Sequence, residues 1–186
     1  MKKYNCLNNQ SFSFDDFEIV PIRFEDRLDI MTWRNEQLYH LRQAKPLTIV
    51  DQENYFATTI QQLFEQKNPS QILFSYLQNG ICIGYGGLVH INWIDKNAEI
   101  SFIMKTSLEK DFFAFNWGIY LDLIEQVAFK ELKLHKIFTY AFDIRKHLYE
   151  AIEAKNFIKE AILPQHCLFN DKFIDVIIHS KINGYE

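Results

Sequence analysis

Two side chains that can take up a proton lie on neighbouring predicted strands of this 186-residue chain. Glu99 falls within Ala98–Met104, and His90 within Leu88–Trp93. A carboxylate in a partly dry cleft has a raised pKa and can accept a proton directly or through water, as general base catalysis requires. Glu99 is therefore our first candidate for a general base, and His90 is the second.

Both residues also have a purely structural interpretation. Glu99 could be a surface glutamate, or it could form an ion pair with Lys96 or Arg34. His90 could be hydrogen-bonded within the sheet, where strict alternation would place it on the same face as Asn92. The sequence alone leaves these alternatives open.

A second constellation, Trp33-Arg34-Asn35, ends a predicted helix. It brings together a stacking surface, a cation suited to phosphate or carboxylate, and an amide. These residues could line a pocket for an acceptor molecule. The alternative is a helix end with a core tryptophan and a solvated arginine.

The segment Gly84-Tyr85-Gly86-Gly87 does not match the nucleotide-binding pattern GxGxxG, because Val89 holds the third glycine position and no helix follows. Glycines inside a strand indicate a bulge or a close approach of the backbone. We expect this segment beside the substrate, with Tyr85 as an acceptor contact.

The elements that must position these residues follow the order hairpin, central strand, helix, strand. Asn79-Gly80 joins Gln71–Leu77 to Ile81–Trp93, since Asn-Gly supplies the positive φ angles of a two-residue turn. After the central strand, a connector (Lys105–Ala114) leads to an amphipathic helix (Phe115–Leu132). The remaining predicted elements are a strand at Phe17–Pro21, helices at Arg23–Glu36 and Gln52–Gln66 (the latter capped by Asp51), a strand at His135–Asp143 and a helix at Arg145–Ala154. A closing hairpin of Ile162–Phe169 and Phe173–Ile182 turns at Asn170-Asp171. Together they predict an α+β domain with a mixed, largely antiparallel sheet flanked by helices.

Composition limits the classes of protein. The chain is 48% hydrophobic and 16% aromatic with a net charge of −4, which predicts one packed domain over residues 1–186 and gives no basic face for nucleic acid. No apolar run approaches the roughly 20 residues that cross a bilayer. Three cysteines and six scattered histidines without metal-ligand spacing predict no disulfide framework, no metal and a cytoplasmic location.

Four local motifs, in the right order and spacing, resemble the GCN5-related N-acetyltransferase (GNAT) superfamily. They are Trp33-Arg34-Asn35, Ala98-Glu99-Ile100-Ser101, the helix end Ala128–Ile137 and the segment Glu153–Glu160. The similar branch contains ribosomal-protein N-acetyltransferases and acetyltransferases of nucleotide-linked amino sugars. The resemblance covers about Phe17 to Ile182 and implies a cleft for acyl-CoA beside the central strand.

The resemblance also implies cofactor contacts. In the family the central strand, here Phe102, Ile103 and Met104, pairs with the pantetheine arm. The usual glycines of the pyrophosphate loop fall near Phe113, Phe115 and Trp117, and Gly118 is the one glycine nearby. Large residues can still present backbone N–H groups to phosphate. The remaining cofactor candidates are Lys110, Asn116, Trp117, Gly118 and Arg145, which stands where the family usually has an asparagine.

A tyrosine in the following helix often protonates the CoA sulfur in this family, which makes Tyr149 the candidate acid, although the family spacing falls nearer Ile152. The resemblance thus predicts an acetyl-CoA-dependent N-acetyltransferase that acts by direct transfer to a primary amine. The favoured acceptor is a small nucleotide-linked amino sugar. The alternatives are an N-terminal peptide or ribosomal protein, a longer acyl donor, and a non-catalytic binding module; a homodimer is compatible with each.

Overall fold

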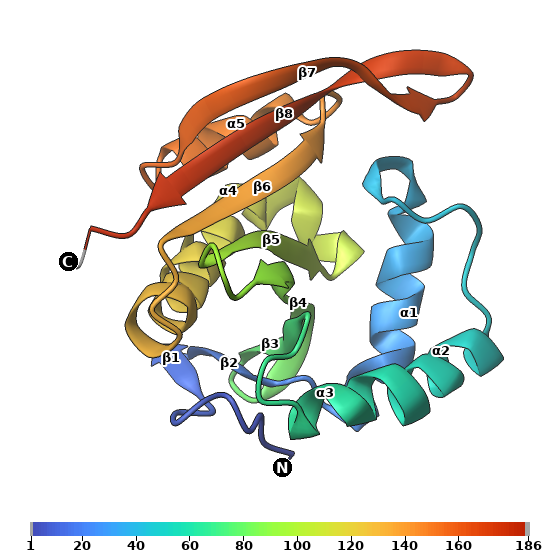
Figure 1. Cartoon of the computed structure of the whole chain (residues 1–186). Coiled ribbons are helices and arrows are strands. Elements are labelled where there is room, and N and C mark those ends of the chain that lie inside the picture. The colour runs from blue at the N-terminus through green and yellow to red at the C-terminus, as the bar shows by residue number, and fades with distance from the viewer. Residues whose placement is uncertain (1, 185–186) are drawn as a thin grey trace.

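The computed structural model describes residues 2–184. Their strands form a single mixed sheet (Figure 1). Its strands, in spatial order, are β1 (Phe12–Phe14), β2 (Phe17–Pro21), β3 (Ile72–Gln78), β4 (Ile81–Asn92), β5 (Asn97–Met104), β6 (Lys136–Phe142), β8 (Lys172–Ile182) and β7 (Ile158–Phe169). All neighbours are antiparallel except β5 and β6. The predicted α+β architecture is confirmed.

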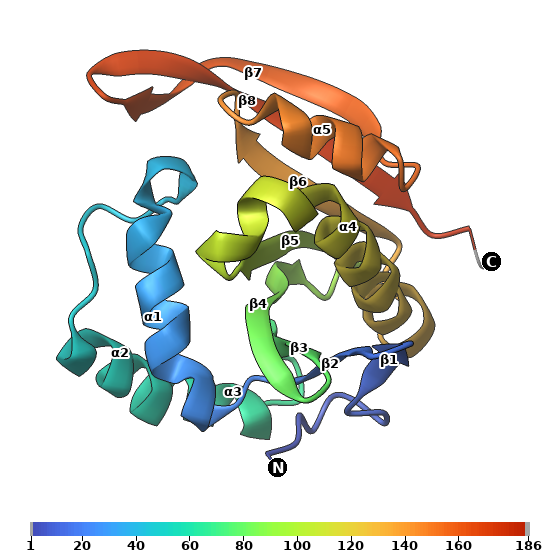
Figure 2. The same cartoon turned by 180° about the vertical axis from the view of Figure 1, so that it is seen from behind.

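Helices cover the sheet on both sides (Figures 1 and 2). The bounds are α1 (Arg27–Glu36), α2 (Ile49–Tyr55), α3 (Gln61–Glu65), α4 (Thr106–Glu125) and α5 (Lys146–Glu153), with π-helical turns at Phe56–Ile60 and Gln126–Glu131. The α4 side is an aromatic core, in which Phe102 stacks on Tyr120 at 3.9 Å between ring centroids. On the other side, α1 and α2 line a pocket with Leu73 and Tyr85.

Both predicted two-residue turns are present. Asn79 and Gly80 have φ angles of 49° and 78°, and Asn170 and Asp171 have 46° and 59°. These left-handed conformations are those of the hairpin turns that match strand twist. The turns fix the β3–β4 and β7–β8 registers.

The predicted connector at Lys105–Ala114 is wrong, because α4 already begins at Thr106 and runs through it with a kink at Phe112. Asn116 stabilises the kink: its side-chain amide donates to the Phe112 carbonyl at 2.9 Å and accepts from the Tyr76 hydroxyl at 3.1 Å. The cap of the second helix also differs from our prediction. Thr48 is the N-cap residue, and Asp51 completes a capping box from the third helical position.

The strand pair β5–β6 opens like a wedge. Parallel pairing is confined to three positions, from Asn97↔Lys136 to Glu99↔Phe138. Beyond them β5 continues to Met104 and β6 to Phe142. The two strands therefore separate just after Glu99 and leave the second edge of β5 free to face a cleft.

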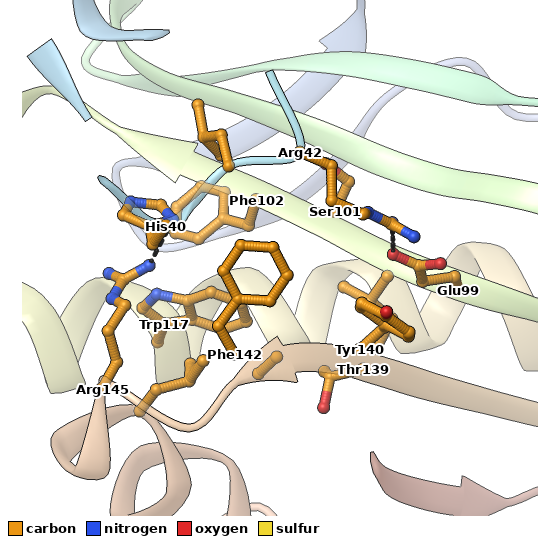
Figure 3. Close-up of a pocket in the computed structure, with 14 residues that line it drawn as sticks. His40, Arg42, Glu99, Ser101, Phe102, Trp117, Thr139, Tyr140, Phe142 and Arg145 are labelled. Carbon is orange, nitrogen blue, oxygen red and sulfur yellow. Dashed lines mark hydrogen bonds and ion pairs between the residues drawn. The ribbon is translucent and has the colours of Figure 1, made fainter. Parts of the chain in front are cut away.

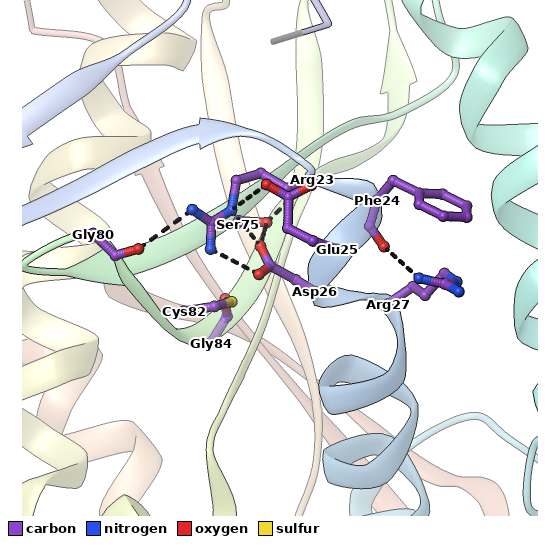
Figure 4. A network of polar contacts seen from close by, with 9 residues as sticks. All are labelled: Arg23, Phe24, Glu25, Asp26, Arg27, Ser75, Gly80, Cys82 and Gly84. Atoms are coloured by element: carbon purple, nitrogen blue, oxygen red, sulfur yellow. Dashed lines mark hydrogen bonds and ion pairs between the residues drawn. The ribbon is translucent and has the colours of Figure 1, made fainter.

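A buried ionic cluster ties the start of α1 to the sheet (Figure 4). The Arg23 guanidinium donates two hydrogen bonds of 2.7 Å to the buried Asp26 carboxylate. The Ser75 hydroxyl of β3 donates to the same carboxylate at 2.6 Å. Arg23 also donates to the Gly80 carbonyl in the hairpin turn. This cluster fixes the position of α1 against β3.

We expect Asp26→Asn to destabilise the fold by about 3–5 kcal/mol, because it leaves the Arg23 guanidinium without its charged partner inside the cluster. Urea denaturation followed by circular dichroism measures the change. The control is Glu25→Gln, since Glu25 is exposed and only 3.6 Å from Arg23; it should change stability by less than about 1 kcal/mol. Equal effects of the two variants would contradict this account of α1.

Candidate active site

The wedge between β5 and β6 contains a cavity of about 110 Å³ (Figure 3). Its lining comes from β5, β6, α4, α5 and the chain after α1: His40, Leu41, Arg42, Glu99, Ile100, Ser101, Phe102, Trp117, Thr139, Tyr140, Ala141, Phe142, Arg145 and Leu148. Figure 3 shows the aromatic side chains of Phe102, Trp117, Tyr140 and Phe142 in this lining, with His40 beside the buried Arg145 at one end and Arg42 beside Glu99 at the other. The cavity is where the sequence predicted an acyl-CoA cleft.

Glu99 stands at the point where the wedge opens. The residue is only 6% exposed, and its carboxylate forms an ion pair with Arg42, not with the Lys96 or Arg34 that the sequence offered. Burial raises the pKa of Glu99, and the charges of Arg42 and His90 oppose that rise. The site thus holds a carboxylate with increased proton affinity beside a cation.

His90 lies beside Glu99 at a bulge in β4. The β4–β5 register shifts between Val89 and Asn92, and His90 has a φ of 51°. His90 and Asn92 are both exposed, with the buried Ile91 between them. The His90 side chain is 67% exposed, and its Nε2 atom lies 3.8 Å from Glu99 Oε2. The glycines of Gly84–Gly87 serve close approach instead: a Cβ on Gly86 would lie 2.0 Å from the Ser101 carbonyl oxygen.

A second pocket, of about 420 Å³, lies on the side of α1 and α2. It shares Ser101 with the cleft, so the two cavities approach the same point of β5 from different sides. Arg34 and Tyr85 line it, and the Arg34 guanidinium donates to the Tyr85 hydroxyl. A volume of this size suits a small organic molecule.

Two of the predicted acceptor contacts lie elsewhere. Trp33 is 5% exposed and packs in the core, so its ring is not available for stacking. The Asn35 amide donates to the Leu47 carbonyl and accepts from the Leu47 N–H; it holds the loop after α1. Of the Trp33-Arg34-Asn35 motif, Arg34 alone lines the pocket.

Tyr149 is also displaced from the predicted position. Its hydroxyl interacts with the Phe142 carbonyl and the Asp143 carboxylate, at 3.3 and 3.1 Å, and its ring stacks on His179. The tyrosine of the cleft lining is Tyr140, from β6. Burial and a contact with Cys167 raise the pKa of Tyr140 to about 12, so its phenol keeps its proton at neutral pH.

The predicted cofactor residues lie in four different places. Phe102, Trp117 and Arg145 line the cleft, while Ile103 and Met104 are buried in the part of β5 beyond its pairing with β6. Lys110 and Gly118 line a separate groove between α4 and α5, in which Gly118 faces the Lys155 side chain. Asn116 is buried beneath the α4 kink and faces Tyr76.

Several polar groups in the cleft fit an acyl-CoA arm. The Thr139 hydroxyl and the Arg145 Nε atom are buried without a hydrogen-bond partner, and β5 presents a strand edge beyond Glu99. A pantetheine arm carries amide groups that can pair with a strand edge and with such side chains. Within residues 2–184, no group of three or more His, Cys, Asp or Glu side chains is placed to hold a metal ion.

Comparison with known proteins agrees with this geometry. The model of the acetyltransferase (GNAT) domain matches residues 19–178. A spermidine N-acetyltransferase from Vibrio cholerae, solved with CoA and spermine, superposes with a TM-score of 0.77 at 18% identity and covers 91% of this chain and 97% of its own. Its dodecameric form in an intermediate state gives 0.73 at 18% identity, covering 91% and 95%. No curated protein matches the sequence.

The chain belongs to the GNAT family. It is an N-acetyltransferase, and acetyl-CoA is its co-substrate. No helix in residues 2–184 is long and apolar enough to cross a membrane.

Among the polar residues of the cleft lining, sequence reasoning missed His40, Arg42, Ser101, Thr139 and Tyr140. His40 and Arg42 lie in a short segment without periodicity between α1 and Lys45-Pro46, so no pattern placed them near β5. Tyr140 did carry a signal, because it lies on β6, the parallel partner of β5, and alternates there with Phe138 and Phe142.

The raised pKa of Glu99 has a consequence for stability. Because the folded state binds this proton more tightly than the unfolded chain does, the resulting stabilisation is full below a pH of about 4.3 and is lost as the pH rises through the folded-state pKa. Glu99→Gln stays neutral, so its stability relative to the native protein should increase from pH 4 to pH 7.5. Urea denaturation at both pH values measures this.

The control for this pH series is Glu65→Gln, which removes one negative charge from the exposed end of α3. The difference in unfolding free energy between Glu65→Gln and the native protein should change less with pH than the difference for Glu99→Gln. A Glu99→Gln variant that loses relative stability as the pH rises would show that the Arg42 charge outweighs burial.

Proposed function

We propose that Glu99 is the general base of the acetyl transfer and that the acceptor is the amine of a nucleotide-linked amino sugar. The observation that carries the proposal is the meeting of the cleft and the second pocket at Ser101, two residues from the buried Glu99 carboxylate. An amine in the second pocket and a thioester in the cleft would approach each other beside this carboxylate. Such positioning supplies much of the acceleration in a two-substrate reaction.

The proton transfers use groups on both sides of β5. The acceptor ammonium must lose a proton before it attacks, and Glu99 receives it, with His90 as the nearby alternative. The amine nitrogen then forms a bond to the acetyl carbon, and the bond from that carbon to sulfur breaks. The Tyr140 phenol, which keeps its proton at neutral pH, replaces Tyr149 as the candidate donor to the departing sulfur.

The charge of the second pocket supports an anionic acceptor. Arg34 brings a cation and Tyr85 a hydroxyl. Asp51 is the one carboxylate among the described lining residues, and it is engaged in the capping box of α2. A polyamine, the substrate that names the Vibrio cholerae enzymes, would meet a like charge at Arg34, whereas a diphosphate would gain a bidentate partner.

We expect Glu99→Gln to lower turnover about 10²-fold or more, since a positioned base contributes a factor of this order. Tyr140→Phe should slow the reaction by a similar or smaller factor, whereas Tyr149→Phe should keep nearly full activity. Thiol release from acetyl-CoA measures turnover, and calorimetry should show that all three variants still bind acetyl-CoA. Full activity of Glu99→Gln with an inactive His90→Ala variant would transfer the role of base to His90.

We expect Arg34→Ala to raise the KM for a nucleotide-linked amino sugar about 10-fold or more, because a charge-assisted hydrogen bond contributes about 1.5–3 kcal/mol. The KM for acetyl-CoA in the same variant is the internal control and should change little. The native enzyme should turn over a panel of nucleotide-linked amino sugars faster than panels of N-terminal peptides and polyamines. Strong peptide or polyamine acetylation without sugar-nucleotide turnover would contradict the acceptor while leaving the roles of Glu99 and Tyr140 open to their own test.

A further inference from the structure

The chain between α1 and α2 crosses the mouth of the cleft. Its first part, Leu38–Arg42, which we call the latch, is a 3-10 turn over Leu38–His40 followed by a bend at Leu41 and Arg42. Figure 3 shows His40 and Arg42 of the latch facing the cleft from opposite ends of its mouth. Both residues belong to the cavity lining.

The latch is held by contacts to three different elements. Arg42 pairs with Glu99 on β5, and its guanidinium carbon lies 4.4 Å from the centre of the Tyr140 ring on β6. His40 accepts a hydrogen bond of 3.0 Å from Arg145 at the start of α5. The latch therefore bridges both strands of the wedge.

The His40 contact depends on a neutral imidazole. Burial, assisted by the charge of Arg145, lowers the pKa of His40 to about 3, so Nδ1 is free to accept while Nε2 donates to Gln37 at 3.2 Å. Gln37 in turn donates to the Met104 carbonyl at 2.8 Å, on the β5 segment expected to pair with pantetheine. Gln37, which precedes the latch and is hydrogen-bonded to His40, thus occupies a carbonyl of the strand that is expected to pair with pantetheine.

The cavity beside the latch is small. It measures about 110 Å³, whereas pockets for drug-sized ligands measure about 300–1,000 Å³. Arg42 is 47% exposed at its side chain, so it can leave Glu99 for solvent without passing through the core. His40, Leu41 and Arg42 are the lining residues that belong neither to a strand nor to a helix longer than one turn, apart from Arg145 at the start of α5.

We propose that acetyl-CoA opens this latch and displaces Arg42 from Glu99, so that the carboxylate is freed to accept a proton only when the acetyl donor is bound. The inference rests on Glu99 being the base. With Arg42 gone, the charged or titratable groups facing Glu99 are His90 on β4 and Tyr140 on β6. The carboxylate then has one cationic partner fewer, and its proton affinity increases.

The first test measures affinity. Part of the binding energy of acetyl-CoA must open the latch. A variant with a weakened closed latch has a larger open population, and its affinity for acetyl-CoA should increase by the same factor. We expect Arg42→Ala to bind acetyl-CoA about 3- to 10-fold more tightly in calorimetry, the range set by one partly exposed ion pair and one cation–π contact.

The matched control is Arg27→Ala. Arg27 also pairs with a carboxylate, Glu53 at 3.0 Å, and covers an aromatic ring, Phe24 at 3.9 Å, but it lies at the start of α1, outside the cleft. Its removal should leave acetyl-CoA affinity within about 2-fold of the native value. A gain common to both arginine variants would be a general effect and would overturn the latch.

The second test follows the Glu99 carboxylate by NMR on protein with ¹³C-labelled glutamate, assigned through Glu99→Gln. Acetyl-CoA should raise the pKa of Glu99 in the native protein, and Arg42→Ala should raise it without ligand. The further rise on adding acetyl-CoA should be smaller in Arg42→Ala than in the native protein. Equal rises in both would overturn the coupling, because they would come from desolvation by the ligand alone.

These outcomes separate the latch from the proposed function. Unchanged or weaker acetyl-CoA binding by Arg42→Ala overturns the latch and leaves the role of Glu99 to the turnover assay. Full turnover by Glu99→Gln overturns the role of the base, and with it the meaning of the coupling, even where Arg42→Ala binds more tightly.

Discussion

The early end of the β5–β6 pairing is the constraint on which the site depends. A parallel pair that stayed hydrogen-bonded to Met104 would leave no cleft, no free strand edge and no opening at Glu99. The strands part after three residue pairs, and Tyr120 of α4 holds the diverging strand by donating to the Ser101 carbonyl at 3.0 Å. Ser101 lies between the two cavities for the same reason: it is the first part of β5 beyond the opening that both sides can reach.

To act as a base, the buried Glu99 carboxylate must be able both to lose and to accept a proton, so neither its protonated form nor its ion pair can be fixed permanently. Burial alone would favour the protonated form of Glu99, and a fully buried partner would fix the charged form. Arg42 comes instead from a segment without regular structure and keeps much of its side chain in water. This arrangement contrasts with Asp26, whose partner Arg23 is anchored to the hairpin turn and serves position, not chemistry.

The features that the sequence predicted well are local. The Asn79-Gly80 and Asn170-Asp171 turns, the strands around them and the placement of Glu99 on the central strand follow from turn chemistry and alternation. The site residues whose positions differ from the prediction depend on tertiary geometry: the Tyr149 ring on α5 stacks on His179, and Trp33 is buried in the core. Arg42 left no periodic signal, because its ion-pair partner Glu99 is 57 residues away in the chain.

The start of α4 shows how this chain adapts a glycine-poor loop. Glycines would let backbone N–H groups approach a pyrophosphate closely, but here Phe113 and Trp117 pack inward, where Phe113 lies under the Arg145 guanidinium at 4.9 Å and Trp117 contacts Phe102. Asn116 satisfies the carbonyl that the kink at Phe112 exposes. Aromatic side chains thus take the volume that glycines would leave open, and the buried Arg145 supplies a cation to the cleft lining. We propose that this side-chain charge takes over anion recognition from backbone amides. The Glu109 carboxylate, which pairs with Arg145, and the neutral His40 of the latch, which accepts a hydrogen bond from it, then take part in the binding equilibrium.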